Sequence, residues 1–213
     1  MNCMTRKPST LPIRKTAIVK GNIKLGEGNT WNVNLPPIMT CQDMPCYKEG
    51  CCYNGKAWRL WPSVRKSWMN NWNHYKENPV KFFNDIILRI RRAKKPPKFF
   101  RWHAAGEIPD QNYYDGMVMV AELFPHIKFL AFTKNYSLAW GIIPKNFQVV
   151  ISAWPGVRLP KVLRDRFPVA WMEDGREKRY KRNPVACSGF CPTCRHACWG
   201  LSKMKRDVVF PRH

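Results

Sequence analysis

The sequence predicts an α/β fold, a small (βα)6-type partial barrel with parallel strands and cysteine-rich metal-binding loops. Three observations lead to this prediction. Short apolar runs alternate with segments of helical periodicity, which is typical of βαβ units and a parallel sheet. Each predicted strand runs into a loop of polar or unusual residues, where α/β folds carry their active sites. Eight of the nine cysteines fall into two short groups.

The elements follow one another along the chain. Residues 1–25 are polar and basic and are expected to form an arm or a loosely attached strand, and residues 26–213 a single domain. Short apolar runs bounded by Gly, Pro or polar residues predict strands at 30–35, 98–103, 127–133, 147–153, 169–172 and 207–210. Apolar residues at helical spacing predict helices at 57–75, 79–94, 113–124, 138–143 and 159–166.

Two of these helices carry further information. The helix at 57–75 has Trp61, Val64, Trp68 and Trp72 at helical spacing, which favours a buried aromatic stripe. The helix at 79–94 ends in a cluster of cations, which the helix dipole explains in part. These cations are Arg89, Arg91, Arg92, Lys94 and Lys95.

The charge is strongly positive. Lys and Arg number 37 against 14 acidic residues, a formal net charge of +23. Such a field attracts polyanions, so DNA or RNA is the expected partner, and interleaved Trp and Tyr residues would suit base stacking. A protein partner or simple solubility are the alternatives.

The expected location is the cytoplasm. The N-terminus lacks the apolar core of a signal peptide, and no run approaches the ~20 apolar residues of a membrane span. Thiols stay reduced in that compartment, which favours metal binding or catalysis over disulfides.

The second cysteine group has the spacing C-x3-C-x2-C-x3-C. Its members are Cys187, Cys191, Cys194 and Cys198. Four thiolates within twelve residues suit either a tetrahedral zinc ion or a 4Fe–4S cluster. His196 lies inside the group and is either a replacement ligand or a solvated loop residue.

The first cysteine group is looser and comprises Cys41, Cys46, Cys51 and Cys52. Three ligands, namely Cys41, Cys46 and either Cys51 or Cys52, would leave one iron of a cluster open for a substrate or cofactor. A structural metal site, or one centre shared between the two groups, remains an alternative.

Candidate cofactor-binding residues lie at or just after the ends of three other predicted strands. They are Ala105, Gly106, Glu107, Thr133, Lys134 and Ser152. Gly106 would let the backbone approach a ligand closely, and the Glu107 carboxylate could bind an amine. Glu107 and His103 are the candidate catalytic residues, although a histidine packed at a strand end is the plainer interpretation of His103.

A metal-dependent nuclease is a weaker hypothesis, because no spacing singles out its carboxylates. The candidates are Asp85, Glu107, Asp110, Glu173 and Asp174. Neither a Walker-type phosphate loop nor a G-x-S-x-G elbow is present in the sequence.

Several motifs resemble those of the gene-product-88 family of phage proteins. They are the N-terminal cysteines closing in Cys52–Tyr53, the segments FRWHAAGEI, FLAFTK and SAWPG, and the C-terminal cysteines followed by VVFPRH. Resemblance to a phage family implies the host cell cytoplasm as the location.

The architecture is also similar to a compact radical S-adenosylmethionine (SAM) barrel. This resemblance implies a 4Fe–4S cluster on the first cysteine group, contact between Glu107 and the amino group of SAM, and an auxiliary cluster on the second group. The first cysteine loop is longer than the C-x3-C-x2-C of that superfamily.

The leading functional hypothesis is therefore a phage or mobile-element iron–sulfur enzyme of radical-SAM-like type, with nucleic acid as a candidate substrate. The alternative is a zinc-stabilised nucleic-acid-binding protein without catalysis. Metal identity separates the two hypotheses.

Overall fold

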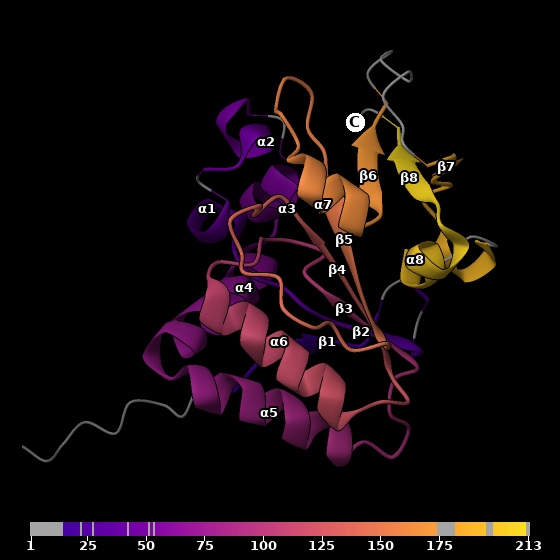
Figure 1. Ribbon diagram of the computed structural model, residues 1–213. Helices are drawn as coiled ribbons and strands as arrows, with labels where there is room; N and C mark the ends of the chain where they lie inside the picture. The colour runs from indigo at the N-terminus through magenta and orange to yellow at the C-terminus, as the bar shows by residue number, and fades with distance from the viewer. Residues whose placement is uncertain are drawn as a thin grey trace, which may run out of the picture.

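A computed structural model describes residues 15–21, 23–26, 28–41, 43–50, 52, 54–173, 182–194 and 198–211. In this part of the chain one eight-stranded sheet has the order β1-β2-β3-β4-β5-β6-β8-β7 (Figure 1). The strands are β1 (Ile18–Val19), β2 (Thr30–Val33), β3 (Phe99–Trp102), β4 (Lys128–Thr133), β5 (Phe147–Ser152), β6 (Val169–Met172), β7 (Pro184–Ala186) and β8 (Asp207–Phe210). All neighbours are parallel except β1 and β2, which pair antiparallel.

Helices connect most of the strands. They are α1 (Pro37–Thr40), α2 (Pro45–Lys48), α3 (Asn54–Leu60), α4 (Pro62–Glu77), α5 (Pro79–Arg91), α6 (Gln111–Leu123), α7 (Lys161–Arg166) and α8 (Leu201–Met204). Two 3-10 turns, η2 (Cys191–Thr193) and η3 (Cys198–Gly200), lie in the second cysteine group. None of the described helices is long and apolar enough to cross a membrane.

The sheet grows in one direction, because β2, β3, β4, β5 and β6 are neighbours in chain order. Its two edge strands, β1 and β7, do not pair with each other, so the sheet is open. The predicted α/β class and parallel strands are confirmed in this coarser form, a mixed α/β fold around an open and mostly parallel sheet.

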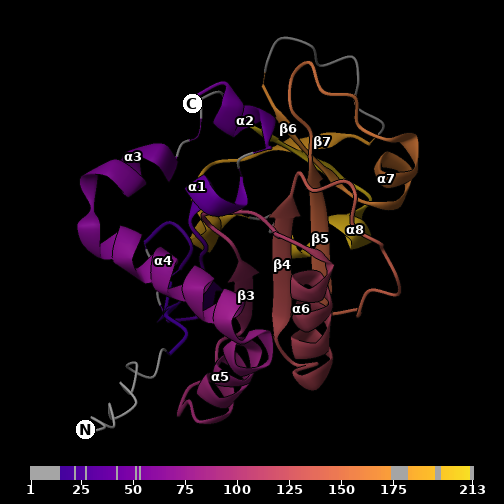
Figure 2. The same ribbon diagram turned by 90° about the vertical axis from the view of Figure 1, so that its left-hand side faces the viewer.

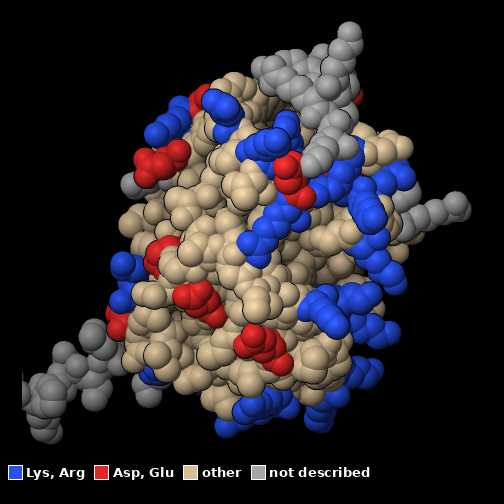
Figure 3. Space-filling view, viewed as in Figure 1, with Lys and Arg blue, Asp and Glu red and all other residues tan. Residues whose placement is uncertain are grey.

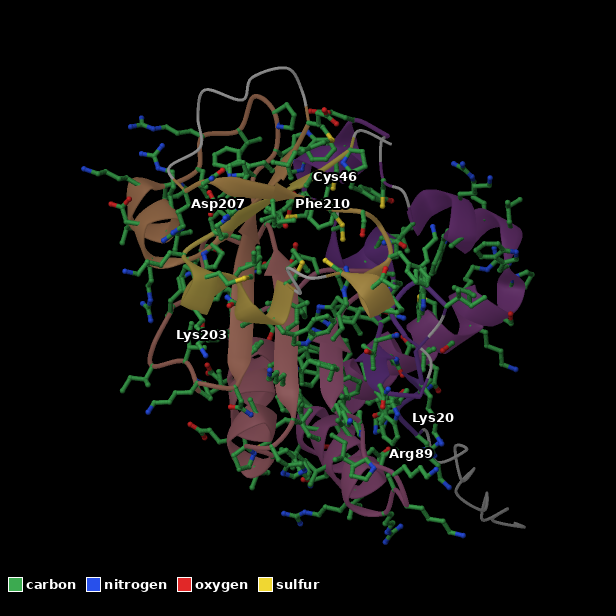
Figure 4. The ribbon with its side chains drawn as sticks, turned by 90° about the vertical axis from the view of Figure 1, so that its right-hand side faces the viewer. Lys20, Cys46, Arg89, Lys203, Asp207 and Phe210 are labelled. Atoms are coloured by element: carbon green, nitrogen blue, oxygen red, sulfur yellow. The ribbon has the colours of Figure 1, made fainter. Side chains whose placement is uncertain are left out.

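Strand periodicity divides the core into two layers. Alternate side chains such as Phe100, Trp102 and Phe129 pack against the helical layer of α4, α5 and α6, which lies in front of the sheet in Figure 2. The intervening side chains, such as Leu130 and Val150, form what we call the inner face. There they pack with Leu201 of α8, together with Ala170, Val185 and Val208. The gold C-terminal segment crosses this inner face in Figure 4.

The helix predicted at 79–94 is confirmed as α5, which ends at Arg91. Its buried apolar side chains are Phe82, Phe83, Ile86, Ile87 and Ile90. The helix predicted at 57–75 is wrong as a single element. It breaks at Trp61, because Pro62 lacks an N–H and forces the residue before it into extended backbone. Trp68 is buried as expected, but Trp61 is 53% exposed, so the predicted stripe is only partly buried.

The short helix predicted at 138–143 is also wrong, since this connection contains no helix. Gly141 disfavours a helix, and Pro144 disfavours helical backbone in the residue before it. The Arg166 guanidinium binds the carbonyls of Trp140 and Gly141. Two strands were not among the six predicted. Ile18–Val19 is an edge strand in the region expected to form an arm or a loosely attached strand. Pro184–Ala186 is only three residues long.

Candidate functional site

A cavity of about 480 Å3 opens at the carboxyl ends of the parallel strands. Such a volume lies within the range that binds small-molecule ligands. In Figure 4 the labelled Cys46 and Phe210, which both line the cavity, lie at this end of the sheet. Its further lining includes Cys41, Cys52, Arg101, His103, Gly106, Glu107, Phe132, Lys134, Ser152, Trp154 and Met172.

The first cysteine loop forms one wall of the cavity. It turns twice, because Pro37 and Pro45 each begin a short helix and their fixed φ suits the first helical position. Two contacts hold this loop to the rest of the site. Thr40 Oγ1 accepts a hydrogen bond from the Glu107 amide at 3.0 Å, and the Trp154 indole N–H donates to Glu49 Oε2 at 3.0 Å.

The thiols of Cys41, Cys46 and Cys52 share this wall and interact electrostatically. Burial, reinforced by the Glu107 carboxylate, raises the pKa of Cys41 to about 12. Burial also raises the pKa of Cys46, against the lowering effect of the Lys134 ammonium. All three are free thiols, and Cys51 lies outside the described residues.

Among the described residues, no group of three or more His, Cys, Asp or Glu side chains is arranged so that it could hold a metal ion. The donor types nevertheless fit a soft metal, because three thiols line one wall. A metal would displace the protons that burial retains on Cys41 and Cys46.

Glu107 is the most tightly held polar residue of the cavity and is only 4% exposed. Its Oε1 accepts from Thr133 Oγ1 at 2.6 Å and from the Ile108 amide at 2.8 Å, and its Oε2 accepts from the Lys134 amide at 2.8 Å. Burial raises the pKa of Glu107, and the Lys134 ammonium and these hydrogen bonds oppose the rise. No other described residue bonds to Oε2, which leaves one of its lone pairs for a ligand.

The loop that carries Glu107 is tied to the end of β2. Asn34 Oδ1 accepts from the amides of Ala104 at 2.8 Å and Ala105 at 3.1 Å, and the Leu35 amide donates to the Ala105 carbonyl at 3.0 Å. Gly106 has φ +90°, and a Cβ there would lie 2.6 Å from the Leu35 carbonyl oxygen. The close backbone approach expected of Gly106 is therefore made to Leu35.

His103 is buried at the end of β3 with φ +55°. Its Nε2 lies 3.0 Å from the Tyr113 hydroxyl, and its Nδ1 makes no hydrogen bond to a described residue. Burial, together with Arg101, lowers the pKa of His103 to about 3, so the imidazole is neutral at pH 7. The neutral imidazole can form hydrogen bonds, but it carries no positive charge.

The other candidates from strand ends meet at the same cavity. Thr133 orients Glu107, Lys134 faces Cys46, and its ammonium lies 5.8 Å from the centre of the Trp154 ring. Ser152 lines the cavity, and its carbonyl accepts from the Tyr136 hydroxyl at 2.6 Å. Ala105 is buried and contributes its backbone to the loop rather than to the cavity wall.

Arg101 is a cavity residue that the sequence interpretation missed. Its guanidinium lies 5.2 Å from the Phe132 ring centre, and its Nε makes no hydrogen bond to a described residue. Alternation along β3 was the available signal, because it places Arg101 opposite the buried Phe100 and Trp102.

The second cysteine group lies on the inner face beside this cavity. Cys187 and Cys198 pack against the inner-face core, and η3 contacts β4 and β5. Burial, reinforced by Cys187, raises the pKa of Cys198 to about 12, whereas Arg101 opposes the rise. Burial also raises the pKa of Cys191, Arg101 opposes the rise, and Cys187 and Cys194 reinforce it. One cation, Arg101, therefore acts on both the second cysteine group and the cavity. His196 lies outside the described residues.

The carboxylates considered for a nuclease are not brought together in the described structure. Asp110 caps α6 and accepts from the Tyr75 hydroxyl at 2.5 Å, whereas Asp85 accepts from the Thr16 amide at 3.2 Å. Glu173 is exposed, and Asp174 lies outside the described residues. Of the four carboxylates that lie in the described residues, only Glu107 lines the cavity.

The family model for gene product 88 matches residues 10–180. The chain belongs to the gene product 88 family. In this family member the matched residues include the first cysteine group, Glu107, Lys134 and Ser152, whereas the second cysteine group lies beyond them. Neither a curated protein nor a solved structure matches the chain.

Proposed function

We propose that this gene product 88 family member is an iron–sulfur enzyme of radical-SAM-like type, with the first cysteine group as its cluster site and the cavity as its SAM site. One observation carries the proposal. The free thiols Cys41, Cys46 and Cys52, the buried Glu107 and the cation Arg101 all line one ligand-sized cavity at the carboxyl ends of parallel strands.

The order of the strands supports the proposed partial barrel. Each βα unit from β2 to β6 adds its strand on the same side of the previous one, as successive units do in a barrel. The cysteine loop follows the first of these parallel strands, and the Glu107 loop follows the second. These are the two places at which the radical-SAM resemblance expects them.

Cys41 and Cys46, with Cys51 or Cys52, would hold the cluster. A 4Fe–4S cluster with one open iron would supply an electron to bound SAM. The protein itself contributes position and charge. Glu107 faces the cavity and suits the ammonium of an amino acid, and Arg101 suits its carboxylate. A bound ammonium would also offset the rise that burial causes in the pKa of Glu107.

A test of this proposal is SAM binding to protein that has been reconstituted anaerobically with iron and sulfide. The variant Glu107→Gln keeps the size of the side chain but loses its charge and places an amide near the Lys134 N–H. We expect its SAM dissociation constant to rise at least about tenfold, the effect of one lost charge-assisted hydrogen bond. The control Glu122→Gln alters an exposed carboxylate on α6 and should bind SAM normally. Equal affinity in the two variants would contradict the proposed role of Glu107.

The second candidate function is a zinc-stabilised, nucleic-acid-binding protein without catalysis. One observation favours zinc at the second cysteine group. Cys187 and Cys198 pack against Leu201 and Val208 in the inner-face core, which is where a closed structural site would stabilise the fold. If zinc is the resident metal there, Cys191→Ser should lower both the zinc content and the melting temperature. Iron that is lost from the same variant would instead indicate an auxiliary cluster.

A further inference from the structure

A basic groove of about 710 Å3 lies between the first strand and the end of α5. Six cations line it, namely Lys15, Lys20, Arg89, Arg92, Lys94 and Lys95. They come from two segments that are about seventy residues apart in the sequence, and all six side chains are exposed. The helix dipole explains cations at the end of α5, but it does not explain Lys15 and Lys20 opposite them.

The cations of this basic groove are not neutralised by described acidic groups. None of the six forms an ion pair with another described residue. The acidic side chain of the groove, Asp85, forms no ion pair with any of these six cations. Its Oδ2 accepts from the Thr16 amide at 3.2 Å and lies 3.8 Å from His74 Nδ1. The groove therefore presents a concentrated positive field to an anion.

The aromatic residue of the groove is closed to a base. Trp31 is only 2% exposed, and the Lys20 ammonium lies 5.5 Å from its ring centre. A nucleobase has no free aromatic face to stack on here, so the groove offers charge without base recognition.

We propose that the basic groove binds the phosphodiester backbone of nucleic acid, independently of sequence. The proposal rests on the nucleic-acid part of the proposed function and names the surface that serves it. In Figure 4 the labelled Lys20 and Arg89 lie at the opposite end of the molecule from Cys46. The groove thus anchors nucleic acid at a distance from the cavity.

The matched control must allow for charge elsewhere on the protein. Lys and Arg also gather toward the side of α7 and α8 in Figure 3. The groove variant is Arg89→Gln/Arg92→Gln/Lys95→Gln. The control variant is Arg158→Gln/Lys161→Gln/Lys203→Gln, which removes the same charge from exposed residues that do not line the groove.

The experiment measures fluorescence anisotropy of a labelled 30-base-pair DNA duplex and of an RNA duplex of the same sequence, from about 50 to 200 mM salt. Each phosphate contact contributes about −0.9 to the slope of log K against log salt for DNA. We expect the groove variant to lose about three contacts, so its slope becomes less negative by about 2.7. Its affinity near 100 mM salt should fall at least tenfold. The control variant should bind the duplexes as the unaltered protein does. The unaltered protein should bind a duplex of scrambled sequence as tightly as the first duplex.

Two results would overturn the proposal, and they differ in what else they affect. Equal losses of affinity in the groove and control variants would mean that nucleic acid is attracted by net charge without a specific site. Nucleic-acid binding would then stand, but the groove would not be its site. If the unaltered protein binds neither duplex at 50 mM salt, both the proposal for the groove and the nucleic-acid part of the proposed function are wrong. Neither result bears on the proposed iron–sulfur site, which is tested separately by iron content and SAM binding. Melting temperatures confirm that both variants fold.

Discussion

Gly106→Ala tests how the Glu107 loop is held against the end of β2. The new Cβ would lie 2.6 Å from the Leu35 carbonyl oxygen and 2.8 Å from the Leu35 Cβ, and both atoms belong to a buried residue. The left-handed φ of +90° costs an alanine about 1–2 kcal/mol, and overpacking adds about 1–3 kcal/mol. We therefore expect the free energy of unfolding to fall by about 2–5 kcal/mol.

Gly156→Ala is the matched control, because Gly156 has φ +79° but no atom within 4 Å of the added Cβ. It should lose only about 1–2 kcal/mol, the cost of the backbone conformation alone. Urea unfolding followed by tryptophan fluorescence measures both variants. The Gly106 variant should also bind SAM more weakly, because Glu107 moves with the loop. Equal destabilisation of the two variants would refute the close approach between the Gly106 loop and Leu35.

Four further predictions follow from other parts of the structure. Asp207→Ala should lower the free energy of unfolding by about 3 kcal/mol, because it leaves Arg182 and the Val169 amide without their fully buried acceptor. Asp43→Ala, at a pair whose aspartate is 93% exposed, should leave the urea midpoint unchanged. His103→Asn keeps a residue that tolerates positive φ and should flatten the fall in stability at acid pH. The fold holds the His103 pKa near 3, whereas the same histidine in the unfolded chain becomes protonated below about pH 6.5. Stability that is present above pH 6.5 is therefore lost as the pH falls toward 3. Parallel curves of unfolding free energy against pH for the wild type and the variant would contradict this. Cys41→Ala/Cys46→Ala should abolish SAM cleavage by reconstituted protein, whereas Cys187→Ala should retain it.

Local patterns predicted most of the parallel strands and the main apolar helix. Residues 98–103 and 127–133 are apolar runs bounded by proline or polar residues. They form β3 and β4, which are parallel neighbours in the sheet. Their register then brings Glu107 and Thr133 together at the end of the sheet, as the general rule for parallel strands implies.

Features that depend on tertiary contacts were harder to predict. The strand Pro184–Ala186 is too short to carry a periodic pattern, and it exists because β8 pairs with it. Gly141 and Pro144 were local signals against the failed helix at 138–143. Pro62 was a local signal for the break between α3 and α4, and the tryptophan spacing around it obscured that signal.

The candidate site was predicted in outline from the positions of loops after strands. Sequence spacing identified Cys41, Cys46 and Glu107, but it did not reveal that Arg101 stands between the cavity and the second cysteine group. Arg101 meets the second cysteine group because the C-terminal segment of the chain folds back across the inner face of the sheet (Figure 4). Periodicity within one strand shows which face a residue occupies, but not what covers that face.

The cluster on the first cysteine group is the central claim, and metal analysis of protein purified without oxygen tests it most directly. We predict about four irons and four acid-labile sulfides per chain, or about eight of each if the second group also holds a cluster. A broad brown absorbance should bleach on reduction, and Cys41→Ala/Cys46→Ala should remove about four of the irons. Stoichiometric zinc in a colourless protein would contradict the claim and leave a structural metal site in a basic binding protein.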